Sequence, residues 1–137
     1  MKRVVVGVLY RITENGNLYL LMSSKKDFGK YTGLFYPIGG HVEDGESDIE
    51  ALKREVFEEL GIMVEPLEEL LEGQGDIAEQ ITSWWICKPL PSAVNTKIDE
   101  SEVKEIKWFT EKEILSNPEL LWTATYRFFK ETLFQRQ

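Results

Sequence analysis

The segment 40–62 constrains the fold more than any other part of the chain, because it runs from a glycine pair into a helix with both ends marked. Ser47 followed three residues later by Glu50 has the pattern of a capping box, in which each side chain accepts from the other residue's backbone N–H. Gly61 is the residue type that ends helices in a left-handed conformation. The pattern therefore predicts a helix over Asp48–Leu60.

This predicted helix has an apolar side and an acidic side. The apolar residues recur at three- and four-residue steps and predict one stripe for the core: Ile49, Leu52, Val56 and Leu60. The acids stand at i, i+3 and i+4 and share one face: Glu55, Glu58 and Glu59. Like charges at this spacing destabilise a helix by roughly 0.2–0.5 kcal/mol per pair. A divalent cation with a preference for oxygen ligands, such as Mg²⁺, Mn²⁺ or Ca²⁺, reverses that cost.

The whole segment is similar to a Nudix box, the signature of the Nudix hydrolase family. Its fixed positions are all filled, in the order Gly40, Glu46, Arg54, Glu55, Val56, Phe57, Glu58, Glu59, Leu60, Gly61 and Ile62. An amphipathic helix with solvated acids would account for the glutamates but not for the glycines and the arginine at fixed offsets. The chain thus resembles a small MutT-like member of the family.

The resemblance implies roles for individual residues. The family's metal-binding positions correspond here to Gly39, through its carbonyl, and to Glu55, Glu58 and Glu59. Arg54 matches an arginine that orients these carboxylates and pairs with the acid at the position of Glu46. The forked guanidinium suits this role better than a lysine does. The implied cofactor is Mg²⁺, with Mn²⁺ as a substitute.

The general base lies outside the box in some family members, on a loop ahead of a late strand with an aromatic end. That strand is predicted at 103–109, and the acids near it are Asp99, Glu100, Glu102 and Glu105. We expect Glu102, at the strand entrance, to be the base and Glu105 to be a solvated strand acid. Glu58 is the alternative base.

Strand and helix signals predict an α/β fold for the remaining chain. Strands are expected at 3–13, 18–24, 34–36, 80–87 and 103–109, with mixed strand and turn character at 62–71, and further helices at 111–115 and 118–134. Asn15-Gly16 predicts a hairpin between the first two strands. A mixed sheet with helices on both sides is an α/β/α sandwich, which the Nudix resemblance also implies.

Composition limits the classes of function. With 137 residues, of which 42% are hydrophobic, the chain suits a single Nudix domain over 1–137. A net charge of −8 argues against a nucleic-acid polymer or a membrane as partner and favours a small phosphorylated nucleotide that arrives with Mg²⁺. No apolar run approaches the ~18 residues of a membrane span, so a cytoplasmic location is expected. A homodimer is compatible with the sequence.

Other residues have plainer interpretations. Cys87 allows no internal disulfide and is expected as a buried thiol on a strand. His41 is expected at the surface. Trp84 and Trp85 should face opposite sides of the sheet, with at least one in the core and the other available to stack on a base. The loop lysines Lys25, Lys26 and Lys30 are expected to be solvated, with phosphate steering as the alternative.

The predicted function is Mg²⁺-dependent hydrolysis of a phosphoanhydride bond in a substrate linked to a nucleoside diphosphate. A (d)NTP or an oxidised (d)NTP is the first choice. ADP-ribose, dinucleoside polyphosphates and nucleotide sugars remain open, because the box recognises only diphosphate and metal. The alternative class is a Nudix-like domain that senses a nucleotide without turnover, and the complete set of glutamates favours the enzyme.

Overall fold

The computed structural model describes residues 1–91 and 98–136, and over these residues its centre is a 6-stranded mixed sheet. The strands are β1 (Lys2–Thr13), β2 (Gly16–Ser24), β3 (Ile38–His41), β4 (Val64–Gln74), β5 (Gln80–Pro89) and β6 (Val103–Thr110). Their order is β4-β5-β1-β2-β6, with β3 also beside β1. The pair β1–β5 is parallel, and the other pairs are antiparallel.

Strand β1 changes its partner along one edge. Its first half pairs with β3, from Val4 to Gly7, and its second half pairs with β2 from Leu9 onward. Strand β5 runs along the other edge of β1 throughout. The predicted hairpin is confirmed, with Thr13 paired to Gly16, which follows the turn with a φ of +113°.

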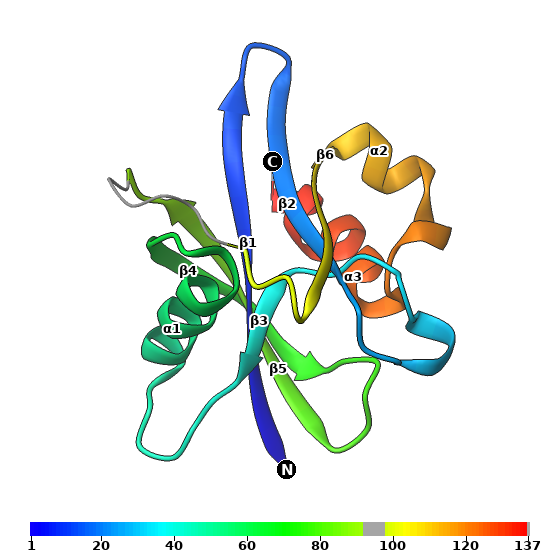
Figure 1. The fold of residues 1–137 in the computed structure, drawn as a ribbon. Helices are drawn as coiled ribbons and strands as arrows, with labels where there is room; N and C mark the ends of the chain where they lie inside the picture. The colour runs from blue at the N-terminus through cyan, green and yellow to red at the C-terminus, as the bar shows by residue number, and fades with distance from the viewer. Residues whose placement is uncertain (92–97, 137) are drawn as a thin grey trace.

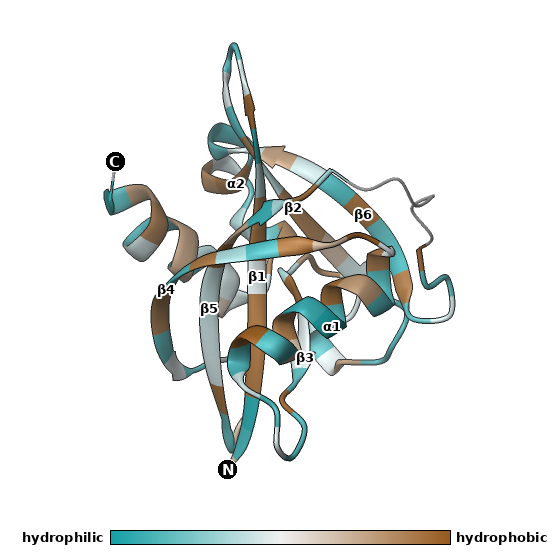
Figure 2. Ribbon diagram, turned by 90° about the vertical axis from the view of Figure 1, so that its left-hand side faces the viewer, coloured by the Kyte–Doolittle hydropathy of each residue, from teal (hydrophilic) through white to brown (hydrophobic). Residues whose placement is uncertain are grey.

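Helices cover both faces of this sheet, which confirms the predicted sandwich. Helix α1 (Asp48–Leu60) lies on one side and the C-terminal helices α2 (Glu111–Ser116) and α3 (Thr123–Arg127) lie on the other (Figure 1). Viewed from the side, α1 crosses in front of β1 and β3 (Figure 2). Short helical turns complete the described chain: η1 (Gly29–Tyr31), η2 (Pro118–Leu120), the π-helical η3 (Phe128–Leu133) and η4 (Phe134–Arg136). In residues 1–91 and 98–136 no helix has the length and apolar character needed to cross a membrane.

The single helix predicted over 118–134 is wrong. The backbone leaves helical geometry at Leu121, which forms a bridge with Phe35, and the Trp122 N–H donates to the Phe35 carbonyl at 3.1 Å. This connection to a distant segment replaces intrahelical bonds at that point. Helical structure resumes at Thr123 with α3.

The strand predicted at 34–36 is displaced toward the box. Phe35 and Tyr36 form only isolated bridges, and the pairing strand is β3, which contains both Gly39 and Gly40. A Cβ at Gly39 would overlap the Val5 carbonyl oxygen, so glycine is what allows β3 to lie so close to β1. Glycine is depleted in strands, and the pair therefore indicated a turn rather than a strand.

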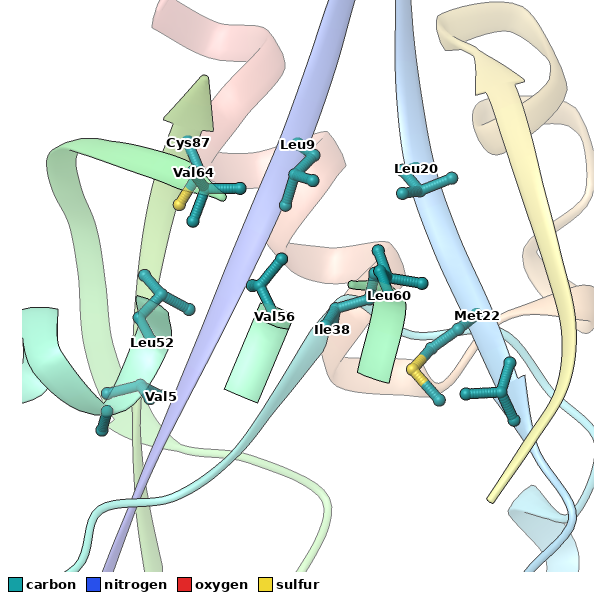
Figure 3. Packing of buried hydrophobic residues seen from close by; sticks show 12 residues of the cluster. Val5, Leu9, Leu20, Met22, Ile38, Leu52, Val56, Leu60, Val64 and Cys87 are labelled. Carbon is teal, nitrogen blue, oxygen red and sulfur yellow. The ribbon is translucent and has the colours of Figure 1, made fainter. Parts of the chain in front are cut away.

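Helix α1 packs its apolar side on the sheet. Both predicted end signals are confirmed, since Ser47 and Glu50 form the capping box and Gly61 adopts a φ of +70°. Figure 3 shows the α1 side chains beside those of the sheet in one cluster, which contains Val5, Leu9, Ile38, Leu52, Val56, Leu60 and Cys87. Ile49 was predicted in this stripe but is 41% exposed, and Ala51 is buried instead.

The opposite face of the sheet has an aromatic core. Trp84 stacks on Phe128 of the C-terminal helices with ring centroids 4.7 Å apart, and Phe109 is buried in the same cluster. Trp85 points to the α1 side, as the alternation of a strand requires. Cys87 is the buried strand thiol that was expected, and burial raises its pKa to about 12.

The α1 interface can be tested by truncation. Leu52→Ala removes a fully buried side chain and should lower the free energy of unfolding by about 2–5 kcal/mol. Ile49→Ala on the same helix should lower it by clearly less, because that side chain is 41% exposed and only partly covered. Chemical denaturation of both variants measures the difference. Equal losses would show that Ile49 belongs to the core.

Candidate active site

Glu55 lies against β3 because the strand has no side chain at the contact. A Cβ at Gly40 would overlap the Glu55 carboxyl group. The Glu55 carboxylate therefore lies directly against the backbone of Gly40, and burial is the main reason that its pKa is raised.

Arg54 binds several acids of the box at once. It forms a two-pronged pair with Glu46, with Nε to Oε2 at 2.6 Å and Nη2 to Oε1 at 2.9 Å. Nη1 donates to Glu55 at 2.9 Å and to Glu58 at 3.3 Å, and Nη2 also donates to the His41 carbonyl at 3.0 Å. The guanidinium holds the pKa of Glu46 at about 2. Arg54 thus links Glu46, Glu55 and Glu58 through one guanidinium group.

Glu59 is a buried acid with an unused oxygen. The residue is 8% exposed, and its Oε2 has no hydrogen-bond partner among the described residues. Burial, followed by the nearby charges of Glu55 and Glu102, raises the pKa of its carboxyl to about 8. The sequence pattern placed all three glutamates on one face away from the core, and it did not indicate that Glu59 would be buried.

Glu102 reaches the same region from the turn before β6. Its carbonyl accepts from the Lys25 N–H at 2.9 Å and from Ser24 Oγ at 3.2 Å, which ties the turn to the end of β2. The Asp99 N–H donates to the Glu59 carbonyl at 2.9 Å, which ties the turn to the end of α1. The predicted base candidate is therefore held beside the box helix by backbone bonds. Glu105 faces solvent on β6.

Lys26 is the loop lysine that enters the site. Its Nζ lies 3.2 Å from Glu102 Oε1, and its charge partly offsets the rise in the pKa of Glu59. Lys25 instead donates to the Glu100 carbonyl, and Lys30 lies 5.2 Å from the Tyr31 ring. Of the three loop lysines, Lys26 is the one that lines the cleft and that can still steer a phosphate.

A cleft of about 280 Å³ connects these residues with an aromatic region. Its lining residues form two groups, called here the acidic end (Gly39, Gly40, Lys26, Glu59 and Glu102) and the aromatic end (Phe28, Tyr36, Trp84, Trp122 and Asp76). Tyr36 joins the two groups, because its ring lies 5.2 Å from that of Trp122 and the charges of Glu59 and Glu102 raise the pKa of its hydroxyl in addition to the larger effect of burial. The size of the cleft is near the lower end of typical small-molecule sites, which measure about 300–1,000 Å³. The cleft offers charge at one end and ring surface at the other. Sequence reasoning found the acidic end and missed most of the aromatic end.

A different acidic group is neutralised within the protein. Among the described residues, the acids whose carboxylates lie within 4.8 Å of one another as a trio are Asp48, Glu69 and Glu72. Arg3 Nη2 lies 2.6 Å from both Asp48 and Glu72. The members come from α1 and β4, so only the fold brings them together. Because the guanidinium already binds two of the three, we do not assign a cation to this group.

The box residues fit a divalent cation. The unpartnered Oε2 of Glu59 is an oxygen ligand without a donor, and burial, followed by repulsion from Glu55 and Glu102, raises the pKa of its carboxyl. The set is made only of oxygen donors, as Mg²⁺ and Mn²⁺ prefer. Glu58 has a side chain that is 56% exposed and pairs with Arg54 at 3.3 Å, and among the described residues its carboxylate does not form a trio within 4.8 Å with those of Glu55 and Glu59. Their roles as ligands remain a prediction.

The fold and the cleft define a small α/β protein suited to a cation and an anionic ligand. The chain belongs to the Nudix family, since the family model of the NUDIX domain matches residues 1–132.

Similar proteins agree with this assignment. Human NAD-capped RNA hydrolase NUDT12 is 26% identical over 113 residues, covering 82% of this chain and 24% of that protein. Mouse 8-oxo-dGDP phosphatase NUDT18 is 28% identical over 111 residues, covering 77% of this chain and 31% of that protein. The chain thus spans a quarter to a third of the length of these relatives. The MutT protein from Methanosarcina mazei Go1 shares the fold, with a TM-score of 0.75 at 24% identity over 98% of this chain and 93% of that one.

The buried Glu59 predicts a pH dependence for the metal-free protein. Its carboxyl has a pKa of about 8 when folded and 4.5 as a free group, so between these values the folded chain holds a proton that the unfolded chain has lost. Raising the pH through this window should lower the free energy of unfolding, by about 1.4 kcal/mol per unit of pKa difference at most. Denaturation in chelator at about pH 5 and about pH 8 measures the loss. Glu59→Gln should reduce it, and an equal loss in both proteins would contradict the burial of this charge.

Proposed function

We propose that the chain is a Mg²⁺-dependent hydrolase of a phosphoanhydride bond in a nucleoside diphosphate-linked substrate, with a (d)NTP or oxidised (d)NTP as the first choice. One observation carries the proposal. Arg54 holds the box carboxylates beside a cleft into which Glu59 brings a buried oxygen without a partner. An acidic cleft of this kind suits a phosphorylated ligand only together with a cation.

The proposed roles follow from these positions. Glu55, Glu58 and Glu59, with the carbonyl of Gly39, would hold Mg²⁺, which when bound neutralises phosphate oxygens and favours ionisation of water. Arg54 and Glu46 keep the carboxylates in place. Glu102 accepts the proton of the attacking water.

Lys26 supplies the positive side chain at the acidic end. In the ligand-free protein it pairs with Glu102, and both side chains are partly exposed, with 59% and 44% of their surface accessible. A pair this exposed is weak, so an arriving phosphate can replace the carboxylate as the partner of the lysine. Glu102 would then be released to act on water.

The relatives support a nucleotide substrate without selecting one. Their names include an NAD-capped RNA hydrolase, an 8-oxo-dGDP phosphatase and, over 54 residues at 43% identity, the nucleoside triphosphatase NudI from Enterobacter sp. (strain 638). Each of these names refers to a nucleotide or a nucleotide-capped molecule. ADP-ribose, dinucleoside polyphosphates and nucleotide sugars share the same diphosphate and remain alternatives.

Metal dependence tests the proposal directly. A panel of these nucleotides is incubated with the protein, and the phosphorylated products are identified. Chelation should abolish hydrolysis, and Mg²⁺ or Mn²⁺ should restore it, because the clustered carboxylates need a cation before an anion can bind. Full turnover in metal-free buffer would exclude the mechanism, and absence of turnover on every substrate with Mg²⁺ would favour a nucleotide-sensing domain.

The base assignment is tested with two acids from the same part of the chain. General-base catalysis is typically worth ~10²–10⁴-fold, so Glu102→Gln should lower kcat by about that factor with little change in metal affinity. Glu105→Gln is the matched control and should be nearly silent. Rates at saturating Mg²⁺ decide between them. A Glu102→Gln variant with nearly unchanged kcat would transfer the role to Glu58.

A further inference from the structure

The aromatic end of the cleft contains a second buried polar atom without a partner. Trp122 is 8% exposed and lines the cleft, and its Nε1 makes no hydrogen bond among the described residues. Leaving a buried donor unpaired costs about 1–3 kcal/mol, and buried indole N–H groups usually have a partner. The position therefore favours a ligand that brings an acceptor.

The indole is held firmly by its neighbours. Tyr31 stacks on it with centroids 4.6 Å apart and ring planes at 14°. Phe28 and Tyr36 contact the same ring at 5.2 Å each, at steep angles. The backbone N–H of Trp122 is bonded to the Phe35 carbonyl at 3.1 Å. Because Tyr31 already occupies a stacking position, the indole is suited to contribute its N–H edge.

Asp76 provides an acceptor in the same region. Its Oδ2 accepts from the Ala124 N–H at 2.8 Å, and its Oδ1 accepts a longer bond of 3.3 Å from the hydroxyl of Tyr31, the ring that stacks on Trp122. A carboxylate has about four acceptor sites, so capacity remains for a ligand donor. An indole donor and a carboxylate acceptor among aromatic rings complement the hydrogen-bonding edge of a nucleobase, which presents acceptors beside N–H groups.

We propose that this end of the cleft is a base subsite, formed by Phe28, Tyr36, Asp76 and Trp122, in which the Trp122 N–H donates to an acceptor atom of the nucleobase. The inference rests on the proposed function, because the phosphates of the same ligand would lie at the Glu59 end. The two unpartnered buried atoms, Glu59 Oε2 and Trp122 Nε1, belong to residues that line the same cleft, so a single nucleotide would contact both residues.

The test separates the base from the phosphates. Binding is measured by calorimetry with Mg²⁺, using α,β-methylene analogues of ATP, GTP, CTP and UTP, and methylenediphosphonate as a base-free probe. The wild-type protein should bind at least one nucleotide analogue about tenfold or more tightly than the base-free probe. Trp122→Phe keeps an aromatic ring but removes the donor, and should weaken that nucleotide about 10- to 100-fold while leaving the base-free probe unchanged.

Trp85→Phe is the matched control. Trp85 also carries a partly buried N–H, but it donates to Ser83 Oγ at 2.7 Å on the α1 side of the sheet. Its substitution should not change the ratio of the two affinities. An equal effect of both substitutions would assign the loss to general destabilisation and overturn the donor role of Trp122.

The remaining outcomes are also decisive. Equal wild-type affinity for nucleotide and base-free probe would overturn the subsite, and a Trp122→Phe variant that keeps the preference would overturn the hydrogen bond. If that variant does not fold, the wild-type protein is titrated with deaza or deoxo analogues that remove one base acceptor at a time. One of them should bind about 10- to 100-fold more weakly, and an unchanged affinity for all would reject the proposal. A wild-type protein that binds none of the phosphorylated probes with Mg²⁺ would instead remove the proposed function together with this inference.

Discussion

The close approach of helix α1 to strand β3 is the constraint on which the rest of the site depends. It brings the Glu55 carboxyl over Gly40, where any side chain would occupy the same space. Once the helix lies there, Glu59 one turn further on turns toward the cleft and becomes buried. Arg54 can then reach both the loop acid Glu46 and the helix acids. A helix packed farther from the sheet would leave these charges in solvent, where their mutual repulsion would be weak.

The parts of the structure that could be predicted from the sequence are those fixed by contacts between near neighbours in the chain. The helix Asp48–Leu60 was predictable to the residue because its capping box and its terminal glycine are contacts between near neighbours in the sequence. The aromatic end of the cleft was not predictable in the same way. Trp122 owes its position to a backbone bond with Phe35, and Asp76 owes its role to Tyr31 and Ala124, all of them distant in sequence. No spacing rule links such residues.

Two of the differences between predicted and observed elements have causes in tertiary packing. Ile49 fits the helical period, but it lies in the first turn of α1, where it is only partly covered and Ala51 is buried instead. The glycines of β3 were left outside the predicted strands because propensity disfavours them there, although the Val5 backbone leaves no room for a side chain at Gly39 and the Glu55 carboxyl group occupies that space at Gly40. In both cases tertiary packing determined the outcome. The placement of Glu102 beside the box similarly depends on backbone bonds to the ends of β2 and α1.

Strand β1 exchanges β3 for β2 along one edge, and both partners contribute residues to the lining of the cleft. The glycines of the acidic end are in register with Val5 and Val6, while Tyr36 of the aromatic end bridges to Met22 on β2, beyond the residues that pair with β1. The positions of Gly39, Gly40 and Tyr36 in the lining are therefore set by hydrogen-bond register. A slip of one residue would invert every side chain of the strand. The pairing of β1 therefore decides which backbone atoms line the cleft, and a change of register would place a residue with a side chain where Glu55 now lies against Gly40.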